Sequence, residues 1–146
     1  PTGTPNNLFP YICKVAAGSL DILNIYGNDW PTPDGTGVRD YIHVMDLAQG
    51  HKLSLEYLFF NKPQVLNLNL GTGRGFSVLE LLNTFKEVNH CKVPYIFVSR
   101  RVGDIAISYA DNSLLKKTIN WTPTRTIEDM CRDGWLWQVT NPDTDC

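Results

Sequence analysis

The chain has 146 residues, which is enough for one average domain with a buried core. Apolar residues make up 42% of it and charged residues 19%, a composition that excludes an intrinsically disordered chain. Thirteen basic and 15 acidic residues give a formal net charge of −2, so the balance does not favour nucleic acid or an anionic membrane surface as a partner. No apolar run approaches the ~20 residues that a membrane-spanning helix requires.

The first seven residues contain neither the basic nor the apolar region of a secretion signal, and they lack an initiating Met. We therefore expect a cytoplasmic location and a chain that begins within a longer protein. The cysteines are widely spaced and form no C-x-x-C pair, which predicts reduced and mostly packed thiols. These residues are Cys13, Cys91, Cys131 and Cys146.

Apolar periodicity predicts four helices, each with a capping residue at its start. The first ends near Gly18, and the last opens with a capping box formed by Thr126 and Asp129. The predicted caps, in chain order, are Asn7, Asp46, Ser77 and Thr126.

Four short runs, at 22–26, 38–44, 65–70 and 95–99, predict strands. Between the first two, residues 27–37 are dense in Gly, Pro, Asn and Asp and predict a surface loop. Because strands alternate with helices, we expect an α/β fold with a small mixed sheet and flanking helices. The strands are too few for a complete doubly wound sheet.

The run Gly71-Thr72-Gly73-Arg74-Gly75 follows a predicted strand and precedes a predicted helix, as a dinucleotide fingerprint does. Its third glycine comes one residue early, and no acidic residue closes a second strand at the required distance. We interpret the run as a tight turn that holds strand and helix close together, with amides that a ligand could reach.

This sequence contains no pattern typical of a catalytic nucleophile, an acid–base pair or a metal site. There is no G-x-S-x-G, and the three histidines, His43, His51 and His90, lie far apart. None of the six tyrosines has Lys four residues later, so the Tyr-x-x-x-Lys acid–base pair of short-chain dehydrogenases is missing. We predict no catalytic residue and no metal site in this chain.

Arg39 and Arg101 lie on separate loops, and each has an aspartate nearby, Asp40 and Asp104. Guanidinium groups match phosphate oxygens bidentately and a carboxylate matches vicinal ribose hydroxyls, so these residues suit a nucleotide diphosphate. The alternative, which spacing alone favours, is that both arginines form surface ion pairs with these aspartates.

Several blocks of this sequence resemble the UDP-glucose 4-epimerase family of extended short-chain dehydrogenases, in order and over essentially the whole chain. They are PNNLFPY at 5–11, IYGNDWPTPDGTGVRDYIHVMDLA at 25–48, NLGTG at 69–73, RVGD at 101–104 and Trp135-x-Trp137-Gln138. The resemblance implies that residues 1–146 are the C-terminal, UDP-sugar-binding portion, without the Rossmann half that holds NAD and the catalytic Tyr and Lys. It further implies that the intact enzyme moves a hydride from the sugar C4 to NAD and back, on UDP-glucose or UDP-galactose. We expect this chain alone to bind no cofactor and to have no epimerase activity.

The resemblance also implies which part of the substrate each matching residue meets. Ser108 matches a position that faces the hexose, where a bulky Tyr would close the pocket, so a serine implies that UDP-N-acetylhexosamines are accepted too. The implied contacts are Asn7, Leu8, Arg39 and Arg101 with the diphosphate, Asn24 and Tyr26 with the uracil, Asp104 with the ribose, and Ser108 with the hexose.

Segments near 44–62 and 126–140 are expected to pack on the absent NAD-binding domain, while Trp121, Trp135 and Trp137 are interpreted as packing residues. Left uncovered, the apolar stripes of these segments predict a homodimer or a non-native oligomer. Two alternatives stay open. The chain is part of another nucleotide-sugar dehydratase or decarboxylase, or it is a non-catalytic fragment that only self-associates.

Overall fold

The computed structural model describes residues 7–141. Its elements in chain order are α1 (Leu8–Ala16), β1 (Leu23–Tyr26), β2 (Val38–Arg39), α2 (Val44–Phe60), β3 (Phe76–Ser77), α3 (Val78–Asn89), β4 (Tyr95–Val98), β5 (Ile107–Ser108), α4 (Ser113–Ile119) and α5 (Ile127–Thr140). Strand β1 pairs in parallel with β4, while β2 lies between antiparallel β3 and parallel β5. The predicted α/β class, with small sheets and flanking helices, is confirmed.

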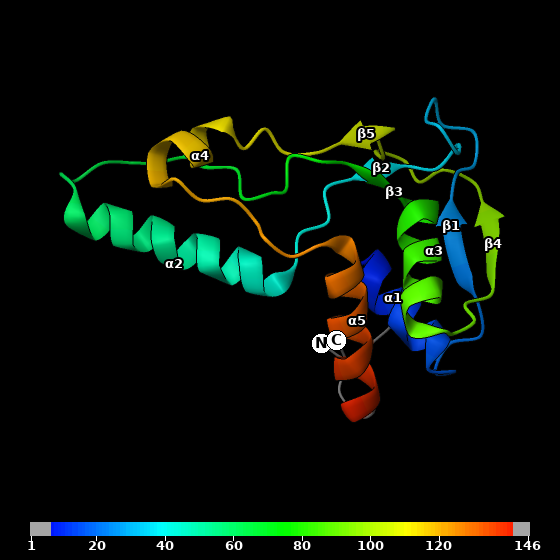
Figure 1. Cartoon of the computed structure of the whole chain (residues 1–146). Helices are drawn as coiled ribbons and strands as arrows, with labels where there is room; N and C mark the ends of the chain where they lie inside the picture. The colour runs from blue at the N-terminus through cyan, green and yellow to red at the C-terminus, as the bar shows by residue number, and fades with distance from the viewer. Residues whose placement is uncertain (1–6, 142–146) are drawn as a thin grey trace.

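The core lies between helices α1, α3 and α5 and the β1–β4 sheet (Figure 1). At its centre the fully buried Phe85 of α3 meets Phe9 of α1 and Trp135 of α5 edge to face, with ring centroids 6.0 and 5.9 Å apart. Leu23 and Ile25 of β1 are also buried. Each such side chain contributes about 1.5–3 kcal/mol by its burial. The predicted packing role of Trp135 is therefore confirmed.

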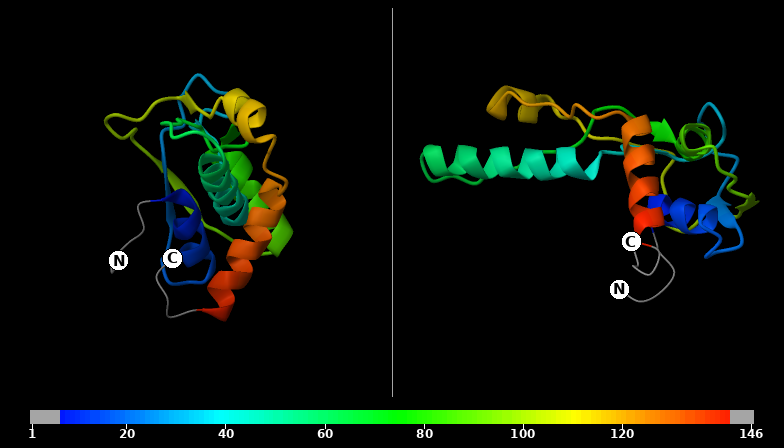
Figure 2. Two further views of the ribbon diagram at one scale, coloured as in Figure 1. Left: turned by 90° about the vertical axis from the view of Figure 1, so that its left-hand side faces the viewer. Right: turned by 60° about the horizontal axis from the view of Figure 1, so that its bottom comes forward.

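Helices α2 and α4 lie side by side and project away from this core, and we call them the arm (Figures 1 and 2). Gly50 of α2 permits the close approach of Leu70 and Trp121, because a Cβ there would lie 2.7 Å from Leu70 and 2.9 Å from the Trp121 ring. The rest of α2 is poorly covered: Phe59 is 76% exposed and Phe60 87%. No helix within residues 7–141 is both long and apolar enough to cross a bilayer.

The helix caps follow the sequence prediction at Ser77 and Thr126 but not at Asp46. Helices α3 and α5, which begin at these caps, each have a complete capping box, in which Glu80 and Asp129 are the reciprocal partners. Helix α2 begins earlier than predicted, because His43 is its cap and accepts the Met45 N–H on Nδ1 at 3.1 Å.

One predicted strand is shorter than expected, and another is not a strand in the structure. Pairing of the 38–44 run ends at Arg39, since α2 begins at Val44. The 65–70 run is not a strand, because a strand needs a hydrogen-bonded neighbour and the described residues supply none. The short helix α4 was not predicted; its seven residues are too few for apolar periodicity to mark it.

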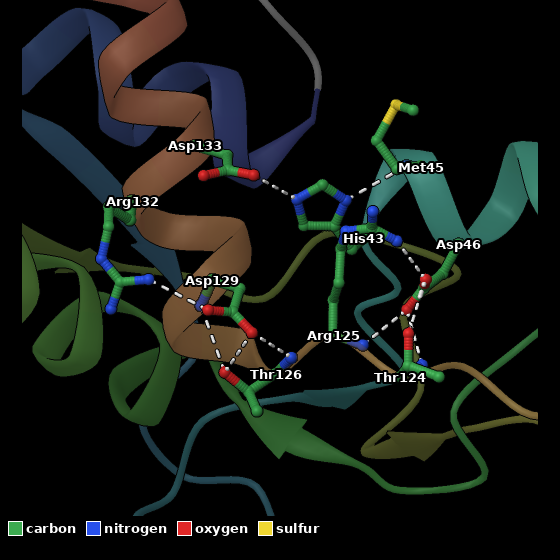
Figure 3. A network of polar contacts seen from close by, with 9 residues as sticks. All are labelled: His43, Met45, Asp46, Thr124, Arg125, Thr126, Asp129, Arg132 and Asp133. Carbon is green, nitrogen blue, oxygen red and sulfur yellow. Dashed lines mark hydrogen bonds and ion pairs between the residues drawn. The ribbon is translucent and has the colours of Figure 1, made fainter.

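Asp46 joins the arm to the segment that leads into α5 (Figure 3). Its carboxylate, with only 3% of the side chain exposed, accepts the backbone N–H groups of Thr124 and Arg125 at 2.9 and 2.8 Å. The guanidinium of Arg125 adds an ion pair of 2.6 Å. Burial acts to raise the pKa of Asp46, but these donors outweigh it and hold the pKa below its ordinary value.

We predict that Asp46→Ala lowers the free energy of unfolding by about 3 kcal/mol, because it leaves two backbone amides and a guanidinium without their buried acceptor. Since the pKa of Asp46 is depressed in the folded state, its contribution is present above pH ~4 and is lost as the pH falls through the folded-state pKa. Urea denaturation at pH 7 and at pH 3 measures both effects. Glu56→Ala, which breaks the exposed Lys52–Glu56 pair on the same helix, is the control and should cost less than about 1 kcal/mol. Equal losses for the two variants would contradict the assignment.

Candidate functional site

A cavity of about 1130 Å³ opens between α1, β1, the start of α2, and α5. It brings together most of the residues predicted for substrate binding, although they come from four separate parts of the chain. Those lining it are Asn7, Leu8, Asn24, Tyr26, Arg39, Arg101 and Asp104. Ser108 instead lines a neighbouring cavity of about 530 Å³, which shares Arg39 with the first.

The loop at 27–37 is a fixed wall beside this cavity. Asp34 accepts the N–H of Thr36 at 2.9 Å and its hydroxyl at 2.7 Å, and a second oxygen of Asp34 accepts the hydroxyl of Ser77. Thr36 is fully buried, so the predicted surface loop is partly an interior element. Burial acts to raise the pKa of Asp34, and the hydroxyl donors of Ser77 and Thr36 lower it below its ordinary value. The loop therefore presents β2, and with it Arg39, in a defined position.

Asp40 does not form the ion pair with Arg39 that spacing favoured. One oxygen of Asp40 accepts the N–H and hydroxyl of Thr72 at 3.0 and 2.6 Å, and the other accepts the N–H groups of Gly73 and Ala110 at 3.1 and 3.2 Å. The glycine-rich run is thus a tight turn, with Gly73 at φ 73°. Because Asp40 occupies the amides of Thr72 and Gly73, these amides are not open to a dinucleotide or to any other anion.

Arg39 consequently has no carboxylate partner within residues 7–141. Its Nη1 donates to the carbonyl of Val38 at 2.8 Å, and its other donors are without protein partners. A guanidinium has five N–H donors, so most of its hydrogen-bonding capacity is available to a ligand. Arg39 borders both cavities, which places this cation at their junction.

Arg101 forms the predicted ion pair with Asp104. Its Nε and Nη2 donate to the two carboxylate oxygens at 3.0 and 3.4 Å, and its guanidinium lies over the Tyr26 ring, 4.7 Å from the centroid. The pair lies on the cavity wall, and the side chain of Arg101 is 53% exposed. The binding and ion-pair interpretations are thus compatible for Arg101, because its half-exposed guanidinium can exchange the carboxylate for a phosphate.

The sequence analysis missed two further polar groups at the cavity. Burial raises the pKa of Tyr41 to about 12, although the charge of Arg39 opposes this. His43 is buried, and its Nε2 lies 3.2 Å from Asp133 of α5 (Figure 3). No spacing in the sequence singles them out, because the whole run at 39–45 lines the cavity, with Asp40 and Ile42 included. Trp137, predicted only to pack, also lines the cavity and is 41% exposed.

Neither a metal centre nor a reactive thiol is built into the described part of the chain. Residues 7–141 contain no group of three His, Cys, Asp or Glu side chains that could hold an ion. Cys91 and Cys131 are free thiols and Cys13 is buried, whereas Cys146 lies outside the described residues. Burial raises the pKa of Cys131 to about 12, which keeps its thiol protonated.

Comparison with known proteins gives one consistent assignment. A family model described as GDP-mannose 4,6 dehydratase matches residues 1–134. UDP-glucose 4-epimerase of Dictyostelium discoideum is 52% identical over 142 residues, covering 97% of this chain but 41% of that protein.

Two solved structures are similar along nearly the whole chain. UDP-glucose-4-epimerase from Stenotrophomonas maltophila, with bound NAD and formylated UDP-arabinopyranose, is 50% identical with a TM-score of 0.93, covering 97% of this chain and 42% of that one. The Bifidobacterium longum enzyme, in complex with NAD+ and UDP, is 47% identical with a TM-score of 0.92, covering 98% and 42%. The chain thus spans about two-fifths of the length of these relatives. It belongs to the GDP-mannose 4,6 dehydratase family, and within that family it corresponds to the C-terminal part of UDP-glucose 4-epimerases.

Proposed function

We propose that this chain holds the UDP part of a UDP-hexose in the larger cavity, as the substrate-binding half of an NAD-dependent UDP-glucose/UDP-galactose 4-epimerase. The observation that carries the proposal is the convergence of Arg39, Arg101 and Asp104 on one cavity. The relatives crystallised with NAD and a uridine nucleotide support it. Their identity of about 50% favours a 4-epimerase over the alternative dehydratase or decarboxylase. The cytoplasmic location stays a prediction of the sequence.

The diphosphate end of the cavity carries positive charge from two sources. Arg39 is without a carboxylate partner among residues 7–141, and the N-terminus of α1 opens at the same cavity. Asn7 makes no side-chain capping bond, so the first amides of α1, beginning at Leu8, lack the acceptor that a cap supplies. Free helix N–H groups and the helix dipole both favour an anion.

The uridine end matches the free edge of β1. Within residues 7–141 strand β1 pairs only with β4, and all four of its residues line the cavity. An unpaired strand edge presents alternating N–H and C=O groups, which complement the C=O, N–H and C=O groups along the edge of uracil. Asn24 and Tyr26 occupy this edge, and the Tyr26 ring adds a surface on which a base can stack. When Arg101 turns to the diphosphate, Asp104 is released to accept the ribose hydroxyls.

The hexose then extends past Arg39 towards Ser108. These two residues are register partners in the β2–β5 pair, and the second cavity joins them. Binding energy from the nucleotide anchors the substrate away from the reacting carbon, so the hexose stays free to turn between the two hydride transfers. NAD, when it is bound in the intact enzyme, supplies the hydride acceptor and donor. The described residues offer no dinucleotide cradle, so we propose that this chain alone binds no NAD and catalyses no epimerisation.

We predict that Arg39→Met and Arg101→Met each weaken UDP binding by about tenfold or more, because each removes charge-assisted hydrogen bonds to phosphate. Isothermal titration of the chain with UDP measures the loss. Arg100→Met is the matched control: Arg100 pairs with Asp29 at 2.7 Å and stacks over Trp30 at 3.8 Å from the ring centroid. An unchanged affinity in both variants, or an equal loss in the control, would overturn the proposed function.

The serine at position 108 predicts which UDP-hexoses the intact enzyme accepts. We expect Ser108→Tyr to reduce turnover of UDP-N-acetylglucosamine by the intact enzyme much more than turnover of UDP-glucose, because the added ring fills space next to the hexose. Coupled assays with the two substrates give the ratio of kcat/KM values. An unchanged ratio would refute the role of Ser108, and unchanged UDP binding in the variant would show that the nucleotide site is intact.

We also propose that the arm and the outer face of α5 are covered by the NAD-binding domain in the intact enzyme. The prediction for 126–140 needs a refinement, since one face of α5 already packs on α3 within this chain. The uncovered apolar residues lie on the other side of α5 and along α2. They include Leu136, Trp137, Val139, Leu55, Phe59 and Phe60.

Without that cover, the isolated chain should self-associate through the arm. Light scattering over a dilution series should show an apparent mass that rises with concentration and does not respond to UDP, since Phe59 and Phe60 lie at the end of α2 remote from the cavity. The Phe59→Ser/Phe60→Ser double variant should lower this mass, whereas Val102→Ser, at an exposed residue outside the arm, should not. A monomer at every concentration would contradict the prediction.

A further inference from the structure

The imidazole of His43 joins the first turn of α2 to helix α5 (Figure 3). Its Nδ1 accepts the N–H of Met45 at 3.1 Å and so caps α2, while its Nε2 lies 3.2 Å from a carboxylate oxygen of Asp133 on α5. The side chain of His43 is only 4% exposed, so water does not readily replace either contact. His43 is thus a joint between the arm and the helical core.

These two contacts assign the proton of the neutral ring to one nitrogen. A ring nitrogen that accepts an N–H carries no proton of its own, so Nδ1 is bare. The proton of the neutral imidazole is therefore on Nε2, which donates it to Asp133. This single tautomer satisfies both partners.

A second proton on the ring is incompatible with the cap. In an imidazolium both nitrogens are donors, so a proton on Nδ1 would face the N–H of Met45. The first turn of α2 would then lose the acceptor that the cap supplies, and a helix without its cap unwinds more readily at that end. Protonation of His43 and capping of α2 therefore exclude each other.

The surroundings of His43 allow both charge states. Asp133 favours the imidazolium, although its side chain is 59% exposed and water screens its charge. Burial and the cap favour the neutral ring, so the two influences oppose each other in the pH range where imidazole changes charge. Besides Asp133, the charged and titratable groups nearby are the paired Asp46 of α2 and Arg125 before α5, and Arg39 and Tyr41 on the same run as His43.

We propose that His43 is a proton-controlled joint, which caps α2 when it is neutral and releases the first turn of α2 in mildly acidic solution. Val44 and Met45, the first two residues of that turn, line the larger cavity. Their release loosens the edge of the cavity and weakens the binding of its ligand. The effect on the ligand rests on the proposed function, whereas the release itself does not.

The test follows hydrogen exchange of the Met45 amide by NMR, with each rate corrected for the intrinsic effect of pH. We expect protection in the wild-type chain to fall about fivefold between about pH 8 and about pH 5.5, the range expected for the loss of one helix cap. His43→Asn should keep its protection over this range, because the side-chain oxygen of asparagine caps a helix and does not titrate.

His51→Asn is the matched control on the same helix. The Nδ1 of His51 lies 2.8 Å from the carbonyl oxygen of Leu47, so it donates whether the ring is neutral or charged. This variant should therefore keep the wild-type response of the Met45 amide to pH.

Asp133→Asn tests the contact with α5. It removes the negative charge that favours the imidazolium and keeps an oxygen that can accept from Nε2. The loss of protection at Met45 should then begin at a lower pH than in the wild-type chain. A defect in packing alone would not move this onset, so an unchanged onset would contradict the assigned contact.

The remaining outcomes separate the joint from its effect on the ligand. Protection that is independent of pH in the wild-type chain, or that falls equally in His43→Asn, overturns the proposal. The affinity for UDP should fall more in the wild-type chain than in His43→Asn over the same pH range, and the titration of UDP itself is common to both. Equal affinity profiles overturn the link to the cavity. A chain that binds no UDP at any pH overturns the proposed function and leaves the exchange result standing.

Discussion

Two aspartates in one short run, Asp40 and Asp46, determine how distant parts of this chain meet. Asp40 accepts backbone amides from residues 32 to 70 positions away, and Asp46 from residues 78 and 79 positions away. Removing a carboxylate from water costs several kcal/mol, and hydrogen bonds to a charged group return about 1.5–3 kcal/mol each, so such a site is stable only when nearly all its acceptor positions are used. The run between them therefore has one arrangement, and Arg39, Tyr41 and His43 take their places on the cavity from it.

The same constraint gives the two arginines different chemistry. Because the amides of the glycine-rich turn occupy Asp40, Arg39 is left as a cation without a carboxylate, and an anion gains its full interaction. In the proposed function, Arg101 gives up its ion pair with Asp104 when it binds a phosphate, so it contributes less net binding free energy than Arg39. That exchange frees Asp104, which lines the cavity, to accept hydrogen bonds from the ribose hydroxyls of the proposed ligand. In this description one arginine supplies most of the attraction, and the other couples the diphosphate to the sugar of the nucleoside.

Local sequence predicted the local features, and long-range contacts decided the rest. The capping boxes at Ser77 and Thr126 need only a partner three residues away, and both were predicted. The partners of Asp40 are remote, so spacing wrongly favoured the adjacent Arg39. Residues 65–70 have the composition of a strand, but pairing depends on a neighbour that sequence periodicity cannot supply. For the site, the resemblance to a family identified Arg39 and Arg101, whereas Tyr41 and His43 emerged only when the structure placed them on the cavity.

The cavity and the uncovered apolar surface are one continuous feature of the molecule. Val44 and Met45 line the cavity at the start of α2 and are themselves 69% and 55% exposed, and the same helix runs outward to Phe59 and Phe60. A domain that covers the arm must therefore reach the cavity at its edge. Apolar burial stabilises by about 25 cal/mol per Å², so covering α2 favours closure of the site as well. In the proposed function, closure excludes water and strengthens the interaction of Arg39 with phosphate, since the guanidinium then acts in a lower dielectric. The proposal thus links the docking of the two halves to the binding of the nucleotide through a single helix.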